Sequence, residues 1–378
     1  MLPEAIEVMT EELAQLGNPS SLHNAGRRAR RVVEESREQI AEVFNARPSE
    51  VVFTSGGTEA DNLAVKGLYW ARHQADPARR RILATSVEHH AVLDSVIWLS
   101  RHEGAEAGWL DVDGQGMLRP EALHAAIEQD PGRLALVSVM WVNNEVGTVL
   151  PIADLAEIAH SYGIVFHSDA VQAAAQLPVD FAGSGADALT VTGHKLGGPI
   201  GVGALLLRRG TEPVPVLHGG GQERDVRSGT LDAPAIRAFA TAVIISAERR
   251  EAEAKRLAVL RDDLIRQVTE AVPDAVLNGP PPGPDRLPGN AHFSFPGCEG
   301  DALLMLLDAK GIACSTGSAC TAGVAQPSHV LLAMGADEDR ARGSLRFSLG
   351  HTSTQEEADA LGACIGEAAE RARRAASR

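Results

Sequence analysis

The chain reads ALTVTGHKLGGP at residues 188–199. The first five residues are mostly apolar or β-branched, which predicts a short strand covered on both faces of a sheet. A glycine-rich polar turn follows and carries a single lysine, Lys195. Ligands of open α/β sheets bind beside the carboxyl ends of strands, so Lys195 is a candidate functional residue. On its own, a lysine in such a turn is more often a plain surface feature.

Similar short apolar runs lie on both sides of this strand. Further strands are predicted at 51–54, 81–86, 134–142, 164–169 and 202–208. Segments with the amphipathic period of a helix separate several of them, at 59–72, 90–102, 120–129 and 152–162. This alternation predicts an α/β fold with a mostly parallel sheet and helices on both faces.

The pattern changes after residue 232. Residues 234–269 predict long helical structure, and a Pro- and Gly-rich loop follows at 278–290. Short strands are then predicted at 291–295, 312–315 and 344–348, with helices at 300–310 and 354–375. We expect a large domain formed by residues 16–248 and a smaller α+β domain formed by residues 1–15 and 249–378.

The composition narrows the class of protein. Of the 378 residues, 44% are hydrophobic and 22% are charged, as is usual in soluble globular proteins. A formal charge of −15 argues against a nucleic-acid or anionic-membrane surface, and no apolar run approaches the ~20 residues that span a bilayer. The four cysteines fit neither a disulfide framework nor a zinc-ligand spacing. We expect a cytoplasmic protein that binds no metal, nucleic acid or membrane.

Other predicted strand ends also carry polar side chains. Asp169 ends one strand, His89 follows another, and Asn144 follows a third. Each has an ordinary explanation when taken alone, such as a helix cap or a turn residue. Because they fall at successive strand ends of one predicted sheet, we expect them to converge on a single ligand site.

Two segments suit an anion. Ser55–Glu59 places two glycines between a strand and a helix, so the helix N-terminus and the Thr58 hydroxyl can donate to a phosphate. Residues 218–230 are rich in glycine and hydroxyl groups and can wrap an anion, although a flexible loop has the same composition. A lysine amine can form a Schiff base with a carbonyl group, and an aspartate such as Asp169 can keep a pyridine nitrogen protonated.

In combination these motifs resemble the cysteine desulfurases of the IscS/NifS type, which are class-V aminotransferases and fold-type I pyridoxal 5′-phosphate (PLP) enzymes. The resemblance runs from about residue 18 to the region of residue 354. It implies a mostly parallel seven-stranded sheet flanked by helices in the large domain, with a smaller α+β domain after it. The motifs that carry it are Ser55–Glu59, Glu88-His89, Val142–Gly147, Asp169–Gln172, Gly193–Lys195, His218–Thr230, Gly317–Thr321 and Arg346–Gly350.

The resemblance implies roles around the cofactor ring. Lys195 would carry PLP as a Schiff base, and Asp169 would pair with the pyridine nitrogen. His89 would stack on the ring and move protons. Asn144 and Gln172 would contact the ring oxygen.

The resemblance also implies a phosphate site. Gly57, Thr58, Thr192 and His194 would bind the phosphate. Thr230 would reach the phosphate held by a neighbouring subunit, which implies a homodimer with shared active sites.

The segment 315–328 is built almost entirely from small residues, so it offers little apolar surface against which a thiol can be buried. We therefore expect Cys320 to be exposed and reactive, and the family carries its persulfide cysteine at the matching position. Arg346 matches the substrate carboxylate with its planar guanidinium, and Asn144 would lie beside the substrate. We expect the other three cysteines to pack structurally: Cys298, Cys314 and Cys364.

The implied activity is PLP-dependent removal of sulfur from L-cysteine, which gives L-alanine and a persulfide on Cys320. The long run 321–328 resembles the IscS/NifS group, which implies delivery to an iron–sulfur scaffold or a tRNA-thiolation enzyme. One rival interpretation is another fold-type I enzyme, such as a selenocysteine lyase or an aminotransferase. Others are a catalytically weakened paralogue that lacks the N-terminal active-site segment, and a binding or scaffold protein that keeps the fold but not the catalysis. Cys320 favours the desulfurase, because transamination needs no thiol.

Family members usually begin with a strand that precedes the position of Met1 and lies near the active site. Every chemical position downstream of that strand is intact here. We expect the codon of Met1 to lie inside a longer reading frame that also encodes this strand. Mass spectrometry of the native N-terminus tests this expectation.

Overall fold

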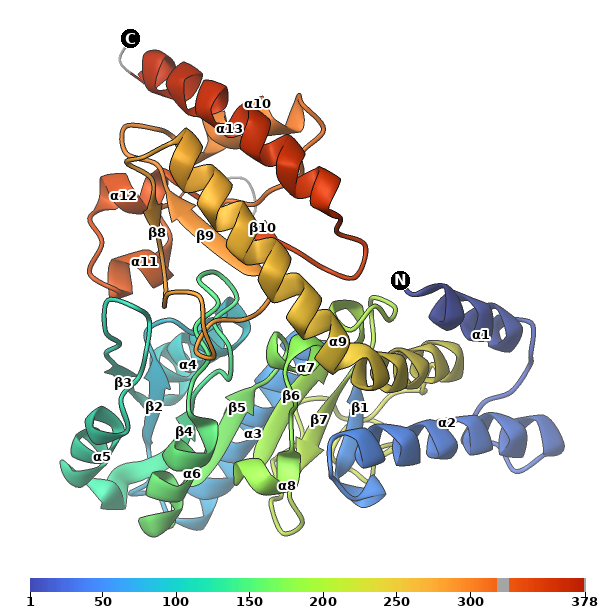
Figure 1. Ribbon diagram of the computed structural model, residues 1–378. Helices are drawn as coiled ribbons and strands as arrows, with labels where there is room; N and C mark the ends of the chain where they lie inside the picture. The colour runs from blue at the N-terminus through green and yellow to red at the C-terminus, as the bar shows by residue number, and fades with distance from the viewer. Residues whose placement is uncertain (318–325, 377–378) are drawn as a thin grey trace. The chain divides into compact units, whose positions relative to one another are not determined.

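The computed structural model describes residues 1–317 and 326–376. The chain divides into two compact units. The first consists of Met1–Leu110, Pro120–Trp141 and Pro151–Arg250, and the second of Asp111–Arg119, Val142–Leu150 and Glu251–Arg378. The colours of Figure 1 follow the residue numbers, so the elements of each unit can be traced separately.

The first unit is built on a seven-stranded sheet with the strand order β1-β7-β6-β5-β4-β2-β3. Strand β7 runs antiparallel to both neighbours, and the other pairs are parallel, which confirms the predicted sheet. Several strands are buried along their whole length, as their continuous apolar runs predict. The strands are β1 (Val51–Thr54), β2 (Arg81–Thr85), β3 (Glu106–Leu110), β4 (Leu134–Ser138), β5 (Val165–Asp169), β6 (Ala188–Thr192) and β7 (Gly203–Leu207).

The edge strand β3 was not predicted. Its residues are half-buried or exposed except for Leu110, so it lacks the apolar run of a central strand. A Cβ added at Gly108 would lie 2.6 Å from Leu83 Cδ2 of β2, which shows how closely the two strands approach. Pairing with β2 therefore selects this strand, and the local sequence gives no signal for it.

The helices of the first unit begin and end at recognisable local signals. The His89 side chain caps the N-terminus of α4, and Gly104 ends that helix in the left-handed region at φ 72°. Helix α3 packs along β4 to β7, and α6 packs against β5 (Figure 1). The elements are α1 (Pro3–Leu13), α2 (Asn24–Val43), α3 (Gly57–Ala75), α4 (His90–Glu103), α5 (Pro120–Glu128), α6 (Ile152–Ser161), α7 (Ala173–Gln176), α8 (Phe181–Ser184), the first part of α9 (Ala233–Ala271), and the short 3₁₀ helices η1 (Pro48–Glu50), η2 (Pro131–Arg133) and η3 (Gly193–Lys195).

The apolar core under α3 and α4 fixes these helices on the sheet. Leu63, Leu68, Ile82, Val92 and Leu136 belong to one buried cluster. Burying a side chain of this size contributes about 1.5–3 kcal/mol. Within the described parts of the chain, no helix combines the length and apolar character that crossing a bilayer requires.

Helix α1 packs within the first unit, whereas the sequence analysis placed residues 1–15 in the smaller domain. Leu2 and Ala5 share a small core cluster with Ala238 and Ala242 of α9. The Leu2 N–H also donates to the Gly197 carbonyl at 2.7 Å. The expected domain boundaries remain a prediction.

The second unit is built on a three-stranded antiparallel sheet with the order β10-β9-β8. Its core includes Phe293, Phe295, Phe347 and Ile365. The strand expected at 312–315 is wrong, because that segment contributes only an isolated bridge between Ser315 and Arg346. The elements are β8 (Val276–Leu277), β9 (Asn290–Ser294), β10 (Ser344–Ser348), the last part of α9, α10 (Gly300–Asp308), α11 (His329–Ala333), α12 (Glu338–Arg342) and α13 (Gln355–Ala376).

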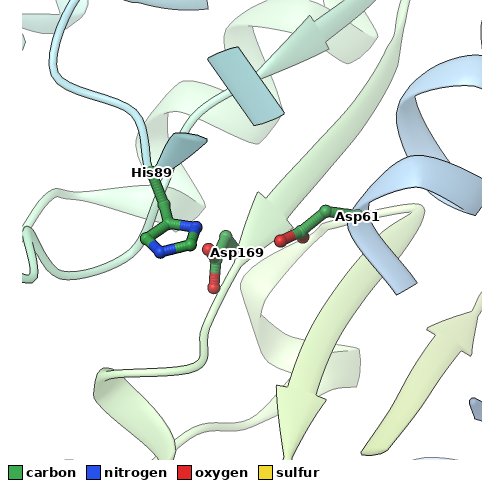
Figure 2. Close-up of side chains that lie close together, drawn as sticks. All are labelled: Asp61, His89 and Asp169. Carbon is green, nitrogen blue, oxygen red and sulfur yellow. The ribbon is translucent and has the colours of Figure 1, made fainter. Parts of the chain in front are cut away.

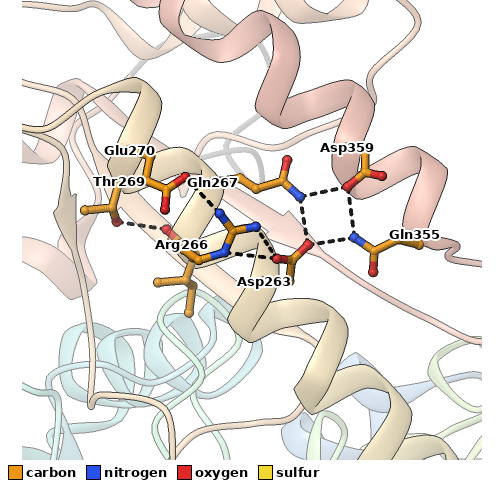
Figure 3. A network of polar contacts seen from close by, with 8 residues as sticks. Asp263, Arg266, Gln267, Thr269, Glu270, Gln355 and Asp359 are labelled. Atoms are coloured by element: carbon orange, nitrogen blue, oxygen red, sulfur yellow. Dashed lines mark hydrogen bonds and ion pairs between the residues drawn. The ribbon is translucent and has the colours of Figure 1, made fainter.

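A polar network joins the last part of α9 to α13 (Figure 3). The Gln267 side-chain amide donates to Asp263 at 2.7 Å and to Asp359 at 2.8 Å. The Gln355 amide donates to the same two carboxylates at 2.6 and 2.9 Å. Each amide therefore bridges two carboxylates, which fixes the register of the two helices.

Candidate active site

Lys195 ends the short helix η3, directly after strand β6. The turn is held by backbone hydrogen bonds, since Gly193 N–H donates to Val202 and Gly198 N–H donates to Gly193 at 2.9 Å. Gly193 is buried, and a Cβ there would lie 2.9 Å from the Pro199 carbonyl oxygen. Only glycine fits this close approach, so the sequence fixes the turn that presents the exposed Lys195 side chain.

Asp169 ends strand β5 and is only 6% exposed. One carboxylate oxygen, Oδ1, accepts a hydrogen bond from Val171 N–H at 2.9 Å. Burial raises the pKa of this carboxyl to about 6, against the opposing effects of the Val171 N–H and the Lys195 charge. At neutral pH Asp169 is therefore a buried anion suited to a cationic partner.

His89 lies at the N-terminus of α4, where its Nδ1 accepts from Ala91 N–H at 3.1 Å. This acceptor role assigns the proton of the neutral ring to Nε2. Burial lowers the pKa of His89, and the charges of His90 and Lys195 add to the effect. His89 is consequently neutral at pH 7 and can donate from Nε2.

Figure 2 shows Asp169 between His89 and a third side chain, Asp61 of α3. One ligand atom from each residue lies within 4.8 Å of the other two. Two carboxylates and one imidazole can hold a metal cation or an organic cation. Asp61 carries no local sequence signal, because its helix reads as an ordinary amphipathic segment.

The N-terminus of α3 forms an open cradle for an anion. Gly56 has φ 146°, and the helix starts at Gly57 with its first N–H groups unpaired within the helix. A Cβ at Gly57 would lie 3.1 Å from Val171 Cγ2, and one at Gly56 would lie 3.9 Å from Thr192 Oγ1. The Thr192 hydroxyl lies 3.2 Å from Nδ1 of His194. Of the residues predicted to bind phosphate, Gly57, Thr192 and His194 therefore lie close together, and Thr58 is exposed on the first turn of α3.

Two ion pairs anchor the loop 218–230 to the same unit. Arg37 binds Glu223 through two nitrogens at 2.8 and 2.7 Å, and both side chains are buried. Arg227 binds Glu59 of α3 at 2.7 and 3.2 Å. Thr230 follows these anchors and is exposed.

Gln172 follows Asp169 closely and precedes helix α7. It is half-buried. The structure therefore places it in the first unit, with Lys195, Asp169, His89 and the anion cradle.

Two predicted substrate residues meet in the second unit. The Arg346 guanidinium donates from Nη1 to the Asn144 carbonyl at 2.7 Å. Within the described residues, Arg346 Nε and Asn144 Oδ1 are buried without a hydrogen-bond partner. The Arg346 Nε–H can donate to a carboxylate, and Asn144 Oδ1 can accept from an N–H group of the same ligand.

Glu145 is a further buried group in the second unit that sequence analysis did not identify. It is 2% exposed, and Ser328 Oγ donates to it at 2.5 Å. Burial raises the pKa of Glu145 to about 7, while Ser328 and the charge of Arg346 act in the opposite direction. A Cβ on Gly317 would also clash with its Oε2. Cys320, which lies between Gly317 and Ser328 in the sequence, is outside the described residues.

Comparison with known families adds the deciding observation. The model of the family described as aminotransferase class-V matches residues 1–361. The chain belongs to the class-V aminotransferases.

The relatives of this class-V aminotransferase include curated cysteine desulfurases. An IscS-like cysteine desulfurase of Mycobacterium tuberculosis (strain ATCC 25618 / H37Rv) is 59% identical over 376 residues, which cover 100% of this chain and 95% of the relative. The cysteine desulfurase NifS of Azotobacter vinelandii is 42% identical over 91% of this chain and 84% of its own length. The predicted family is confirmed.

Solved structures agree with the fold of this class-V aminotransferase. A NifS-like protein has a TM-score of 0.88 and 34% identity, covering 97% of this chain and 95% of that protein. A structure of SspA in complex with cysteine has a TM-score of 0.79 and 32% identity, covering 92% and 95%. The predicted fold-type I architecture is therefore confirmed.

The three described cysteines of this class-V aminotransferase are structural, as predicted. Cys298 and Cys364 lie in the core of the second unit, and Cys314 packs against it. Burial, assisted by Asp308, raises the pKa of the Cys314 thiol to about 11. A thiol that stays protonated at neutral pH is a poor nucleophile.

Proposed function

We propose that the chain is a cysteine desulfurase that holds PLP on Lys195 and transfers sulfur from L-cysteine to Cys320. The observation that carries the proposal is the grouping of Lys195, Asp169 and His89 with the anion cradle of α3 at one edge of the first unit's sheet. The names of the relatives support the same activity, since they are cysteine desulfurases of IscS and NifS type.

The residues present fit PLP in its three distinctive parts. A phosphate suits the glycine cradle, where side chains at Gly56 and Gly57 would narrow the approach to the helix N–H groups, Thr192 and His194. A protonated ring nitrogen suits the buried carboxylate of Asp169. An aldehyde suits the exposed amine of Lys195. When bound, PLP supplies an electron sink for the bonds broken at the substrate α-carbon.

The protein's own groups would then handle protons and orientation. The Lys195 amine, once released by the substrate, would remove the α-proton. Neutral His89 would donate from Nε2, which its hydrogen bond with Ala91 leaves available. Arg346 would bind the substrate carboxylate with Asn144 beside it.

Cys320 would receive the sulfur. Its thiolate would attack the sulfur of the substrate, so that an S–S bond forms while the substrate C–S bond breaks. The carbon skeleton would leave as L-alanine after protonation. The persulfide would pass to an acceptor protein of the iron–sulfur scaffold or tRNA-thiolation type.

The cellular location and the subunit arrangement are also part of the proposed function. It places the protein in the cytoplasm as a homodimer in which Thr230 reaches the phosphate held by the other subunit. The exposure of Thr230 at the end of an anchored loop supports this role. The proposed domains are residues 16–248 for the cofactor, and 1–15 with 249–378 for the cysteine segment and Arg346.

An absorbance spectrum recorded before and after L-cysteine is added tests the proposed function. The purified protein reconstituted with PLP is expected to absorb in the visible region, to change its spectrum with cysteine, and to form alanine. A colourless protein, or one that forms no alanine, would contradict the proposal. Transfer of the amino group to a keto acid without sulfide would instead indicate an aminotransferase.

A further inference from the structure

Three acidic side chains are buried at the site edge of the first unit. Their exposed fractions are 1% for Asp61, 0% for Glu88 and 6% for Asp169. Asp169 has a role in the proposed function. Glu88 closes the turn after β2, where its Oε1 accepts from Thr85 Oγ1 at 2.5 Å and Met140 N–H at 2.9 Å. Asp61 is the one acid that neither the turn nor the proposed mechanism explains.

Among the described residues, His167 is the one basic side chain in an ion-pair position with Asp61. Its Oδ1 accepts no hydrogen bond from the described residues, and His167 Nε2 lies 3.6 Å away. Burial lowers the pKa of His167 to about 3, so this imidazole is neutral at pH 7. Its two nitrogens are occupied by the Thr190 and Ser138 hydroxyls at 3.1 and 2.9 Å.

Asp61 faces Asp169, the carboxylate that is proposed to pair with the ring nitrogen of the cofactor. Figure 2 shows its carboxyl group pointing toward Asp169 from helix α3, with His89 on the far side of Asp169. The ligand atoms of the three residues lie within 4.8 Å of one another. Two buried carboxylates at this separation repel each other, and one proton held between them relieves that repulsion.

We propose that Asp61 is a positioning residue for the cofactor ring: it forms with Asp169 a buried carboxyl pair that holds one proton in the empty protein. Seating a protonated ring nitrogen against Asp169 releases that proton to solvent and leaves both carboxylates charged. The second negative charge then strengthens the field that keeps the ring nitrogen protonated. This inference rests on the proposed function.

The electrostatic surroundings support the pair. Burial raises the pKa of Asp61 well above its usual value, and Asp169 and Glu88 raise it further, whereas Thr190 opposes them through a hydrogen bond. The other titratable groups that face the pair are His167 of β5, His89 at the start of α4 and Lys195 after β6. Two of these are neutral imidazoles, so Lys195 is the one cation among the groups named here.

Stability and cofactor affinity should respond in opposite directions to Asp61→Asn. In the cofactor-free protein the pair keeps a proton that the unfolded chain gives up at neutral pH, which lowers the free energy of unfolding. Asp61→Asn removes this cost, so we expect the melting temperature of the cofactor-free protein to rise by a few degrees. The affinity for pyridoxamine 5′-phosphate, which needs no bond to Lys195, should fall about tenfold at pH 8.

Proton release provides the second readout. The wild-type protein should release close to one more proton than Asp61→Asn when pyridoxamine 5′-phosphate binds at pH 6, as measured by calorimetry in buffers of different ionisation enthalpy. By linkage, each pH unit of acidification should lower the affinity of the wild-type protein for the probe about tenfold more than it lowers the affinity of the variant. The titrating groups of the probe are the same in both experiments and cancel in the difference.

The controls separate a positioning role from a structural one. Asp154→Asn, on the exposed side of α6, should change neither the melting temperature nor the affinity. Asp61→Ser provides a second variant that removes the charge if the asparagine protein does not fold. A variant that melts earlier and binds the probe like wild type would overturn the inference. Failure of wild type to bind the probe would instead refute the proposed function.

Discussion

Replacing Cys320 with serine is expected to abolish sulfur transfer while the cofactor stays bound. A hydroxyl at this position cannot accept the substrate sulfur as a persulfide, so alanine and sulfide formation should fall by on the order of 1,000-fold or more. The visible absorbance of the PLP-loaded protein should stay unchanged, because none of the residues proposed to hold PLP is altered. Alanine and sulfide are measured with cysteine and a reductant.

Cys314→Ser is the matched control for this prediction. Its thiol packs against the core, and its pKa of about 11 keeps it protonated at neutral pH. Desulfuration by this variant should stay within about twofold of wild type. Activity retained by Cys320→Ser, or lost in Cys314→Ser, would contradict the assigned sulfur acceptor.

Of the proposed substitutions, Glu223→Gln should lower the free energy of unfolding the most. The Glu223 carboxylate is 0% exposed, pairs with Arg37 at 2.7 Å and accepts the Phe53 N–H of β1 at 2.8 Å. The exchange removes the buried anion of Arg37 and leaves the half-exposed Glu34 as its remaining ion-pair partner, which costs about 3–5 kcal/mol. The free energy of unfolding is measured by urea denaturation followed by circular dichroism.

Glu34→Gln provides the control, because Glu34 contacts the same Arg37 at 3.1 Å but is 47% exposed. A surface pair of this kind contributes about 0–1 kcal/mol. Similar losses for the two variants would mean that burial does not govern the strength of the pair. The Glu223 variant should also bind PLP more weakly, since Glu223 anchors the loop that ends at Thr230.

The sequence predicted those parts of the fold that depend on local pattern. The buried strands β1, β4, β6 and β7 are largely apolar. The polar residues that follow β1, β2, β5 and β6 mark the site edge. Strand β3 was missed because pairing with β2 creates it. The segment 312–315 was wrongly predicted as a strand, because a short apolar run contains no information on whether a partner strand lies beside it.

The same distinction applies to the candidate site. Lys195 and Gly57 stand in turns with a recognisable glycine pattern, so the sequence identifies them. Asp61 and Glu145 occur within an ordinary helix and an ordinary turn. Their importance arises from burial and from neighbours distant in sequence, such as Asp169 and Ser328, and only the folded structure supplies these.

The attachment of PLP to Lys195 tests the central claim most directly. The protein is reconstituted with PLP, reduced with borohydride, digested and examined by mass spectrometry. We predict a pyridoxyl group on the peptide that contains Lys195, and its absence from a Lys195→Arg variant. A wild-type protein that carries no adduct, or carries it on Lys66, Lys255 or Lys310, would contradict the account.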